Sequence, residues 1–85
     1  MARNISTDRQ MSLRMAISDL IHGVRCDNHI TQEELANRAG ISYEHLNHIE
    51  NYKATPSIEV LDKLARSLGF THVSQFLAHD KKHIL

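Results

Sequence analysis

The stretch Thr31–Asn51, TQEELANRAGISYEHLNHIEN, contains the start and stop signals of two short helices with almost no chain between them. Thr31 can cap the first helix. Glu34, three residues later, completes a capping box in which each side chain accepts a hydrogen bond from the backbone N–H of the other residue. Gly40 follows at a position where a left-handed residue commonly ends a helix. Ser42 can then cap the second helix. The stretch therefore predicts two consecutive helices joined by a tight turn.

The inward-facing residues of these helices have the spacing of a helix-turn-helix. Two helices that meet at about 90 to 120° need a small residue where their backbones approach and a residue that tolerates positive φ at the corner. They also need branched apolar side chains that hold the second helix against the first. Counted from Gln32 as the first position, these requirements are met by Ala36 (fifth), Gly40 (ninth), Leu46 (fifteenth) and Ile49 (eighteenth). The spacing favours a helix-turn-helix over an ordinary helical hairpin.

Upstream of this stretch, apolar residues at helical spacing predict one long helix. We expect it to begin after Ser6 or Thr7, either of which can cap it, and to end near Asn28. Its buried stripe is expected to comprise Leu13, Ile17, Leu20, Ile21 and Val24.

Downstream, two further helices are expected. Thr55 as cap with Pro56 at the first helical position is a consistent helix opening, and Gly69 is the expected stop. The inner stripe of this helix is expected to comprise Ile58, Leu61, Leu64, Ala65 and Leu68. Thr71 is expected to cap a fifth helix, with Val73, Phe76 and Leu77 facing inward. The sequence thus predicts an all-α protein with a domain over residues 13–79, an N-terminal extension over 1–12 and a C-terminal tail over 80–85.

The composition and motifs of the chain argue against a secreted protein, a membrane protein, a metal-binding protein and an enzyme. With 85 residues the chain suits one small domain. Cys26 is the only cysteine, so no intramolecular disulfide can form, and we expect the protein in a reducing, cytoplasmic environment. We expect the Cys26 side chain itself to be buried as a small apolar group. No apolar segment is long enough for a signal peptide or a membrane span. Histidine pairs at 45 and 48 and at 79 and 83 lack a third ligand, so no metal is expected. No catalytic constellation or cofactor motif is found, so we expect no enzyme.

The residues TQEELANRAGIS, HLNHIEN and PSIEVLDKLARSLG resemble the Cro/CI, or XRE-type, helix-turn-helix regulators of phages and bacteria. The resemblance covers about Ile17 to Leu77. It implies a compact five-helix bundle like the DNA-binding domain of lambda repressor. It also implies a transcriptional regulator, usually a repressor, that binds a palindromic double-stranded DNA operator as a homodimer. No small-molecule ligand is implied, since the chain leaves no room for a sensing domain.

The resemblance also assigns residues to roles. It places four side chains of the second helix in the major groove, namely Ser42, Tyr43, Glu44 and Asn47. His48 lies farther along, as a neighbour of a phosphate. It implies that Gln32 binds a phosphate at the start of the first helix, where the free backbone donors favour an anion. Asn51, Tyr52 and Lys53 match positions that hold the sugar-phosphate backbone.

The same resemblance implies one structural role. Arg25 and Glu50 match a partly buried ion pair that braces the long first helix against the groove-binding helix. Because the fifth helix is expected at the edge of the bundle, we expect the dimer surface there, and it comprises Phe70, Val73, Phe76 and Leu77. The N-terminal extension, with Met11 and Met15, is a second candidate for this surface.

The charge distribution does not favour a polyanion partner. The chain has a formal net charge of zero, and residues 31–53 carry four Glu against Arg38 and Lys53, a net charge of minus two. A DNA-binding domain usually shows a basic footprint. An alternative is therefore a protein-interaction module of the same fold, such as an antitoxin or a phage adaptor, in which DNA binding is secondary. If DNA is the partner, few counterions would be released and the salt dependence would be shallow.

Overall fold

The computed structural model describes residues 5–79, and the side chains of residues 12–79. Within this range every regular element is a helix, which confirms the all-α class. The five helices are α1 (Ile5–Asp27), α2 (Gln32–Ala39), α3 (Tyr43–Glu50), α4 (Ile58–Ser67) and α5 (Val73–Ala78). The predicted tail over 80–85, the start of the predicted extension and His83 lie outside the described residues. The predicted boundary at residue 12 falls inside α1.

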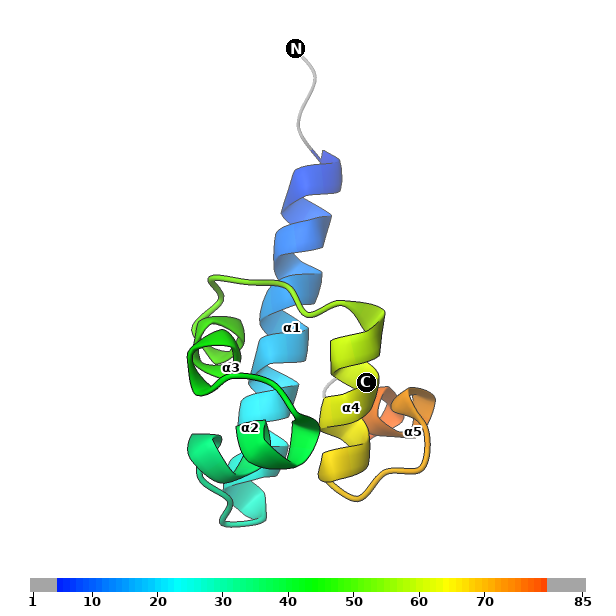
Figure 1. Cartoon of the computed structure of the whole chain (residues 1–85). Coiled ribbons are helices and arrows are strands. Elements are labelled where there is room, and N and C mark those ends of the chain that lie inside the picture. Colours follow the sequence, from blue (N-terminus) through cyan, green and yellow to red (C-terminus); the bar gives the residue numbers. More distant parts are fainter. Residues whose placement is uncertain (1–4, 80–85) are drawn as a thin grey trace.

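The helices are arranged around the C-terminal half of α1 (Figure 1). α2 and α3 contact each other, and α3 also contacts α1. α4 packs against α2, and the short α5 packs against α4. The first turns of α1 project beyond the other helices. α2 therefore contacts both α3 and α4, while α1 packs against α3 and α5 lies against α4.

The core is formed by apolar side chains from all five helices. Leu35 and Leu46 join α2 to α3, and Ile21 and Leu64 bring α1 and α4 to the same centre. The remaining buried apolar residues are Leu20, Val24, Ala36, Ala39, Ile49, Leu61, Ala65, Leu68 and Phe76. A fully buried leucine, isoleucine or phenylalanine contributes about 1.5 to 3 kcal/mol relative to an exposed one. This core holds α3 in place from one side only.

The first four helices end in the same hydrogen-bonded motif. In each, a residue just past the last helical residues has positive φ, and the next backbone N–H reaches back five residues to a helix carbonyl, as in a Schellman motif. Gly40 and Gly69 occupy the left-handed position after α2 and α4. His29 (φ 57°) and Tyr52 (φ 65°) occupy it after α1 and α3. A residue with a Cβ costs about 1 to 2 kcal/mol in this conformation, so two helix ends carry strain that glycine would remove.

Some expectations for α1 are wrong. The helix already includes Ile5, so Ser6 and Thr7 lie inside it and not before its first residue. Leu13 is 57% exposed rather than buried, because this part of α1 extends past the helices that cover the rest of the stripe. Cys26 is also exposed rather than buried.

The openings of α4 and α5 also differ from the sequence expectation. Ser57, not Thr55, caps α4, and its hydroxyl accepts a hydrogen bond from the Val60 backbone N–H at 3.1 Å. Pro56 is buried in the loop before the cap. Ile58 becomes the first residue of the helix and is 75% exposed, since no preceding turn covers it.

α5 begins after His72, whose side chain makes no capping bond, and Thr71 lies one residue before the cap. The backbone N–H of Thr71 instead donates to the side chain of Gln75. Phe76 is buried as expected, but Leu77 points outward and is 40% exposed. The expectation that Leu77 faces inward is therefore wrong.

Candidate nucleic-acid interface

The α2–α3 unit has the local structure that its sequence predicts. Thr31 and Glu34 form the capping box, with backbone-to-side-chain distances of 2.9 and 3.0 Å. The backbone N–H and the hydroxyl of Thr31 both donate to the Glu34 carboxylate, and these two hydrogen bonds lower its pKa. Gly40 is left-handed (φ 73°), and its N–H and that of Ile41 close the end of α2. The Ser42 hydroxyl accepts from the His45 backbone N–H at 3.0 Å and caps α3.

α3 has a buried face and an open face. Leu46, Ile49 and Glu50 are buried against the bundle. Tyr43 is 53% exposed, and Glu44 is exposed beside it in the first turn. Asn47, His45 and His48 are half-buried. α3 therefore presents polar and aromatic side chains to solvent along one side, as its predicted role requires.

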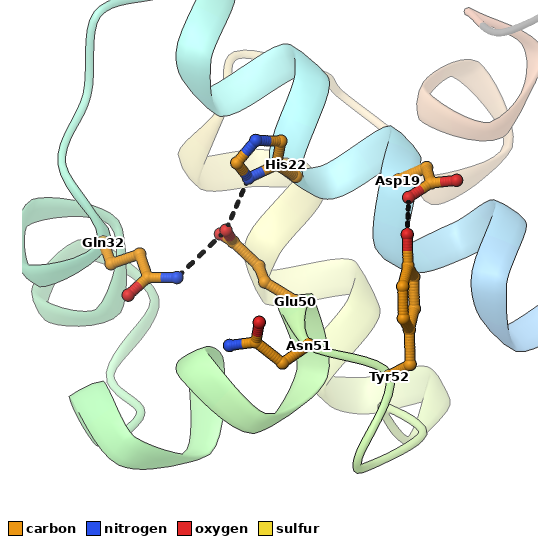
Figure 2. Close-up of a pocket in the computed structure, with 6 residues that line it drawn as sticks. All are labelled: Asp19, His22, Gln32, Glu50, Asn51 and Tyr52. Carbon is orange, nitrogen blue, oxygen red and sulfur yellow. Dashed lines mark hydrogen bonds and ion pairs between the residues drawn. The ribbon is translucent and has the colours of Figure 1, made fainter.

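Glu50 is the buried centre of a polar cluster that joins α1, α2 and α3. Arg25 Nε donates to Glu50 Oε2 at 2.7 Å and Arg25 Nη2 donates to Oε1 at 2.8 Å, a two-point contact. A third Arg25 donor, Nη1, reaches the carbonyl of Ile30 at 2.8 Å. His22 Nδ1 lies 3.0 Å from Glu50 Oε1 (Figure 2). The structure thus brings together the two residues that the sequence paired and adds His22.

The environment of Glu50 keeps this carboxyl ionised. Burial would raise the pKa of Glu50, but hydrogen bonds from Arg25, His22 and Gln32 outweigh burial and hold that pKa below its ordinary value. The hydrogen bond to Glu50 in turn raises the pKa of Arg25. A charge pair of this kind is costly to break from one side because it leaves the other charge buried alone.

Gln32 lies between this cluster and α3. Its Nε2 donates to Glu50 Oε1 at 3.0 Å, as Figure 2 shows, and its Oε1 accepts from Asn47 Nδ2 at 3.1 Å. Both ends of the Gln32 amide are therefore engaged inside the protein. Sequence reasoning placed Gln32 and Asn47 in separate roles and missed their contact, because the two residues are fifteen positions apart in the chain.

The end of α3 is fastened to α1 by two contacts that the sequence did not reveal. The buried Ser18 hydroxyl donates to the carbonyl of Ile49 at 2.6 Å. The Tyr52 hydroxyl donates to the carboxylate of Asp19 (Figure 2), which raises the pKa of Tyr52. The one available signal was a serine in the apolar stripe of α1, seven residues before Arg25 on the same face.

The loop after α3 carries exposed polar side chains. Asn51 Nδ2 donates to the carbonyl of Asn47 at 2.8 Å, and Lys53 is exposed. A shallow surface pocket of about 240 Å³ lies between this loop, α1 and the start of α2. Its lining, drawn in Figure 2, comprises Asp19, His22, Gln32, Glu50, Asn51 and Tyr52.

The predicted dimer surface is only partly open. Phe76 is fully buried and its ring lies edge-on to Phe70, with ring centroids 5.3 Å apart. Phe70 and Val73 are half-buried, and Leu77 is exposed. Of the second candidate surface, Met15 is 44% exposed, and the side chain of Met11 lies outside the described residues. Phe76 is thus a core residue of the single chain, and the exposed part of the predicted surface is centred on Leu77.

Two short helices joined at a left-handed glycine, with the second helix buried on one side and polar on the other, define a helix-turn-helix. The helix-turn-helix family model matches residues 16–76. The chain therefore belongs to the helix-turn-helix family and is a transcriptional regulator of the XRE type. The relatives described next are named as helix-turn-helix transcriptional regulators, the class of protein that the sequence predicted.

Two curated relatives are similar to this chain over most of its length. An uncharacterized HTH-type transcriptional regulator, y4dJ of Sinorhizobium fredii, is 32% identical over 63 residues, which is 74% of this chain and 82% of that protein. A second, from Methanothermobacter thermautotrophicus, is 32% identical over 62 residues, 73% of this chain and 90% of that protein.

Among solved structures, a helix-turn-helix family transcriptional regulator from Vibrio cholerae matches with a TM-score of 0.75 and 25% identity. The match covers 86% of this chain and 40% of that one, so this chain spans less than half of the solved protein. The likeness supports the same fold over the matched part.

A membrane-spanning helix and a metal-binding group are both absent from the part of the chain that the structure describes. In it, no helix combines the length and the apolar character needed to cross a membrane. Over the same residues, no three His, Cys, Asp or Glu side chains lie together in a group that could hold a metal ion.

Proposed function

We propose that this protein is a sequence-specific transcriptional repressor. In this proposal it binds a palindromic operator as a homodimer, with α3 in the major groove and residues 13–79 forming the DNA-binding domain. The single observation that carries the proposal is the open polar face of α3. A regulator of this kind would work in the cytoplasm, where the chromosome is.

The side chains on the open face match the chemistry of base edges. The Tyr43 ring suits a thymine methyl or a phosphate, the Glu44 carboxylate can accept from cytosine N4, and the Asn47 amide can bond adenine. Ser42 stands at the start of the same face, although its hydroxyl also caps α3. His48 lies farther along, in reach of the backbone. In this proposal these five residues contact the bases or lie directly beside those contacts.

Contacts to the sugar-phosphate backbone would lie on both sides of α3. On one side stand the exposed side chains of Asn51 and Lys53. On the other stands the N-terminus of α2, where free backbone N–H groups and the helix dipole attract a phosphate. Because the Gln32 side chain is engaged with Glu50 and Asn47, we assign the phosphate contact at this point to the backbone N–H groups.

The low net charge supports a shallow salt dependence. Lys53 is the sole lysine or arginine of the loop, and residues 31–53 sum to minus two. The logarithm of the binding constant falls by about 0.9 for each phosphate neutralised per decade of salt. We expect a slope between about minus two and minus five. A slope steeper than about minus eight would require a basic surface that the described residues do not form.

A homodimer would place two copies of α3 about 34 Å apart, in successive major grooves on one side of the duplex. Leu77, with the exposed edges of Phe70 and Val73, is the proposed contact surface at the edge of the bundle. Sedimentation at increasing concentration tests it. Leu77→Glu should keep the chain monomeric, and a dimer unaffected by that change would place the contact elsewhere.

The deciding experiment is selection of bound duplexes from a random pool, followed by affinity measurements on the recovered sequence. We expect a palindrome with two half-sites about ten base pairs apart between their centres. Glu44→Ala and Asn47→Ala should relax preference at separate positions by about 1 to 3 kcal/mol each. No enrichment from the pool would contradict the proposal.

The charge balance favours one alternative, a protein-interaction module of the same fold. An antitoxin or phage adaptor of this kind would meet a protein partner through α3 and hold DNA weakly. Passage over immobilised heparin and nonspecific duplex at low salt separates the two functions. The interaction module should flow through, whereas the repressor should be retained.

A further inference from the structure

The hydrogen bonds that run from Arg25 to Asn47 have a direction that chemistry fixes. The ionised Glu50 carboxylate has only acceptors, so Gln32 must turn its Nε2 toward it. Gln32 Oε1 then faces Asn47, so Asn47 must donate to it from Nδ2. At each of these two contacts only one arrangement of donor and acceptor is possible. The charge buried between α1 and α3 thereby sets the orientation of an amide on the open side of α3.

The consequence for Asn47 follows from the planar shape of its amide. With Nδ2 directed at Gln32, Oδ1 faces away from Gln32. Nδ2 carries two hydrogens, and the contact with Gln32 uses one of them. Asn47 is therefore set to offer an acceptor, with one N–H beside it, to whatever group approaches from the groove.

Turning either amide over would create repulsion. A flipped Asn47 would place Oδ1 against Oε1 of Gln32, and flipping Gln32 as well would place Oε1 against the carboxylate of Glu50. Asn47 is half-buried, so water only partly relieves a mismatched contact at this position. An asparagine on a fully exposed helix face has no such restriction and can offer either end of its amide.

We propose that Gln32 is a positioning residue that sets Asn47 to read a base carrying an amino group in the major groove. Such a base is adenine, through N6 and N7, or cytosine, through N4, whereas the O6 of guanine and the O4 of thymine offer only acceptors at the corresponding place. The inference rests on the proposed function and adds the class of base that one position accepts. It also gives Gln32 a role other than binding phosphate through its side chain.

The test compares base preference at the one position that Asn47 reads. Asn47→Ala first identifies that position in the selected duplex as the one where preference relaxes. Duplexes with each of the four base pairs there are then titrated with the native protein and with Gln32→Met, which keeps the length of the side chain and removes both hydrogen bonds. Glu33→Gln is the matched control. Glu33 is exposed on the same turn of α2 and makes no described hydrogen bond to Gln32, Asn47 or Glu50.

For the native protein we expect adenine or cytosine to be preferred over guanine and thymine by about tenfold. In Gln32→Met the preference should fall to about threefold or less at that position and stay unchanged at others. Glu33→Gln should shift all four affinities together. In the Asn47→Ala background, Gln32→Met should change no preference further, because Gln32 acts through Asn47.

A second readout does not depend on DNA. The side-chain amide hydrogens of Asn47, followed by NMR in the free protein, should exchange with solvent faster in Gln32→Met than in the native chain. Unchanged exchange, together with unchanged preference, would overturn the proposal.

The measured affinities show whether a failure concerns the role of Gln32 alone or the proposed DNA-binding function as well. Uniform weakening across the four duplexes in Gln32→Met would mean a phosphate or purely structural role, and a native preference for guanine or thymine would mean the opposite amide orientation. Either result overturns the inference and leaves the proposed function standing. A native protein that binds no duplex overturns both.

Discussion

Replacing Arg25 with methionine tests how the fold depends on the buried cluster around Glu50. The Glu50 side chain is 2% exposed and that of Arg25 11%. Removing one partner of a buried pair typically costs about 3 to 5 kcal/mol. His22 and Gln32 remain beside the carboxylate, so we expect the lower end of that range. A domain of this size has about 4 to 13 kcal/mol of stability in total, so Arg25→Met should unfold at a far lower urea concentration than the native chain.

The pH dependence gives the same variant a distinctive signature. In the native chain the pKa of Glu50 is lowered, so its contribution is present above the unfolded value of 4.5 and is lost as the pH falls through the folded pKa. Without Arg25, burial should raise the pKa of Glu50 above the unfolded value. The folded variant then takes up a proton more readily than the unfolded chain. Its stability should therefore rise as the pH falls from about 7 to 5.

Urea unfolding followed by circular dichroism at several pH values measures both effects. The double variant Arg25→Met/Glu50→Met is the control, since replacing both charges with apolar groups is often neutral or stabilising. We expect it to recover most of the loss. If Arg25→Met costs less than about 1 kcal/mol, or follows the pH dependence of the native chain, the pair behaves as a surface contact and the reasoning from burial is refuted.

Four further changes test the helix ends and the loop. His29→Gly should raise thermal stability by about 1 kcal/mol, because glycine removes the left-handed strain; a loss would mean that the imidazole makes an important contact. Tyr52→Gly relieves the same strain but loses the bond to Asp19, so its melting temperature should rise less than that of His29→Gly, and an equal rise would make that bond negligible. Ser42→Ala should lower the free energy of unfolding by about 1 kcal/mol through loss of the α3 cap, whereas no change in denaturant midpoint would show that water serves as well. Lys53→Ala should weaken all duplexes alike and reduce the salt slope by about one, and a base-specific effect in the titrations would contradict a phosphate contact.

The parts of the fold that were predictable depend on signals close together in the sequence. The capping box at Thr31, the glycine corner at Gly40 and the cap at Ser42 each involve residues within one helical turn, and all three are present. Thr55 and Ser57 are both able to cap α4, and the proline between them favoured the wrong choice. The exposure of Leu13 could not be predicted, because it depends on where the other helices end along α1.

The site was predictable to a similar degree. Resemblance to a family paired Arg25 with Glu50, and the structure places them in contact. The contact between Gln32 and Asn47 joins two helices and depends on the angle at which they cross, which no local pattern encodes. The left-handed conformation of Tyr52 was equally hidden, because the sequence has no glycine at that point and the tyrosine is held by a residue of α1.

Backbone amide shifts measured by NMR while the selected duplex is added give the most direct test of the open face of α3 as the DNA-binding surface. The largest changes are expected over residues 42–53 and at the start of α2, with α5 altered only where two copies meet. Changes confined to α4 and α5, with residues 42–53 unaffected at saturation, would show that DNA binds elsewhere.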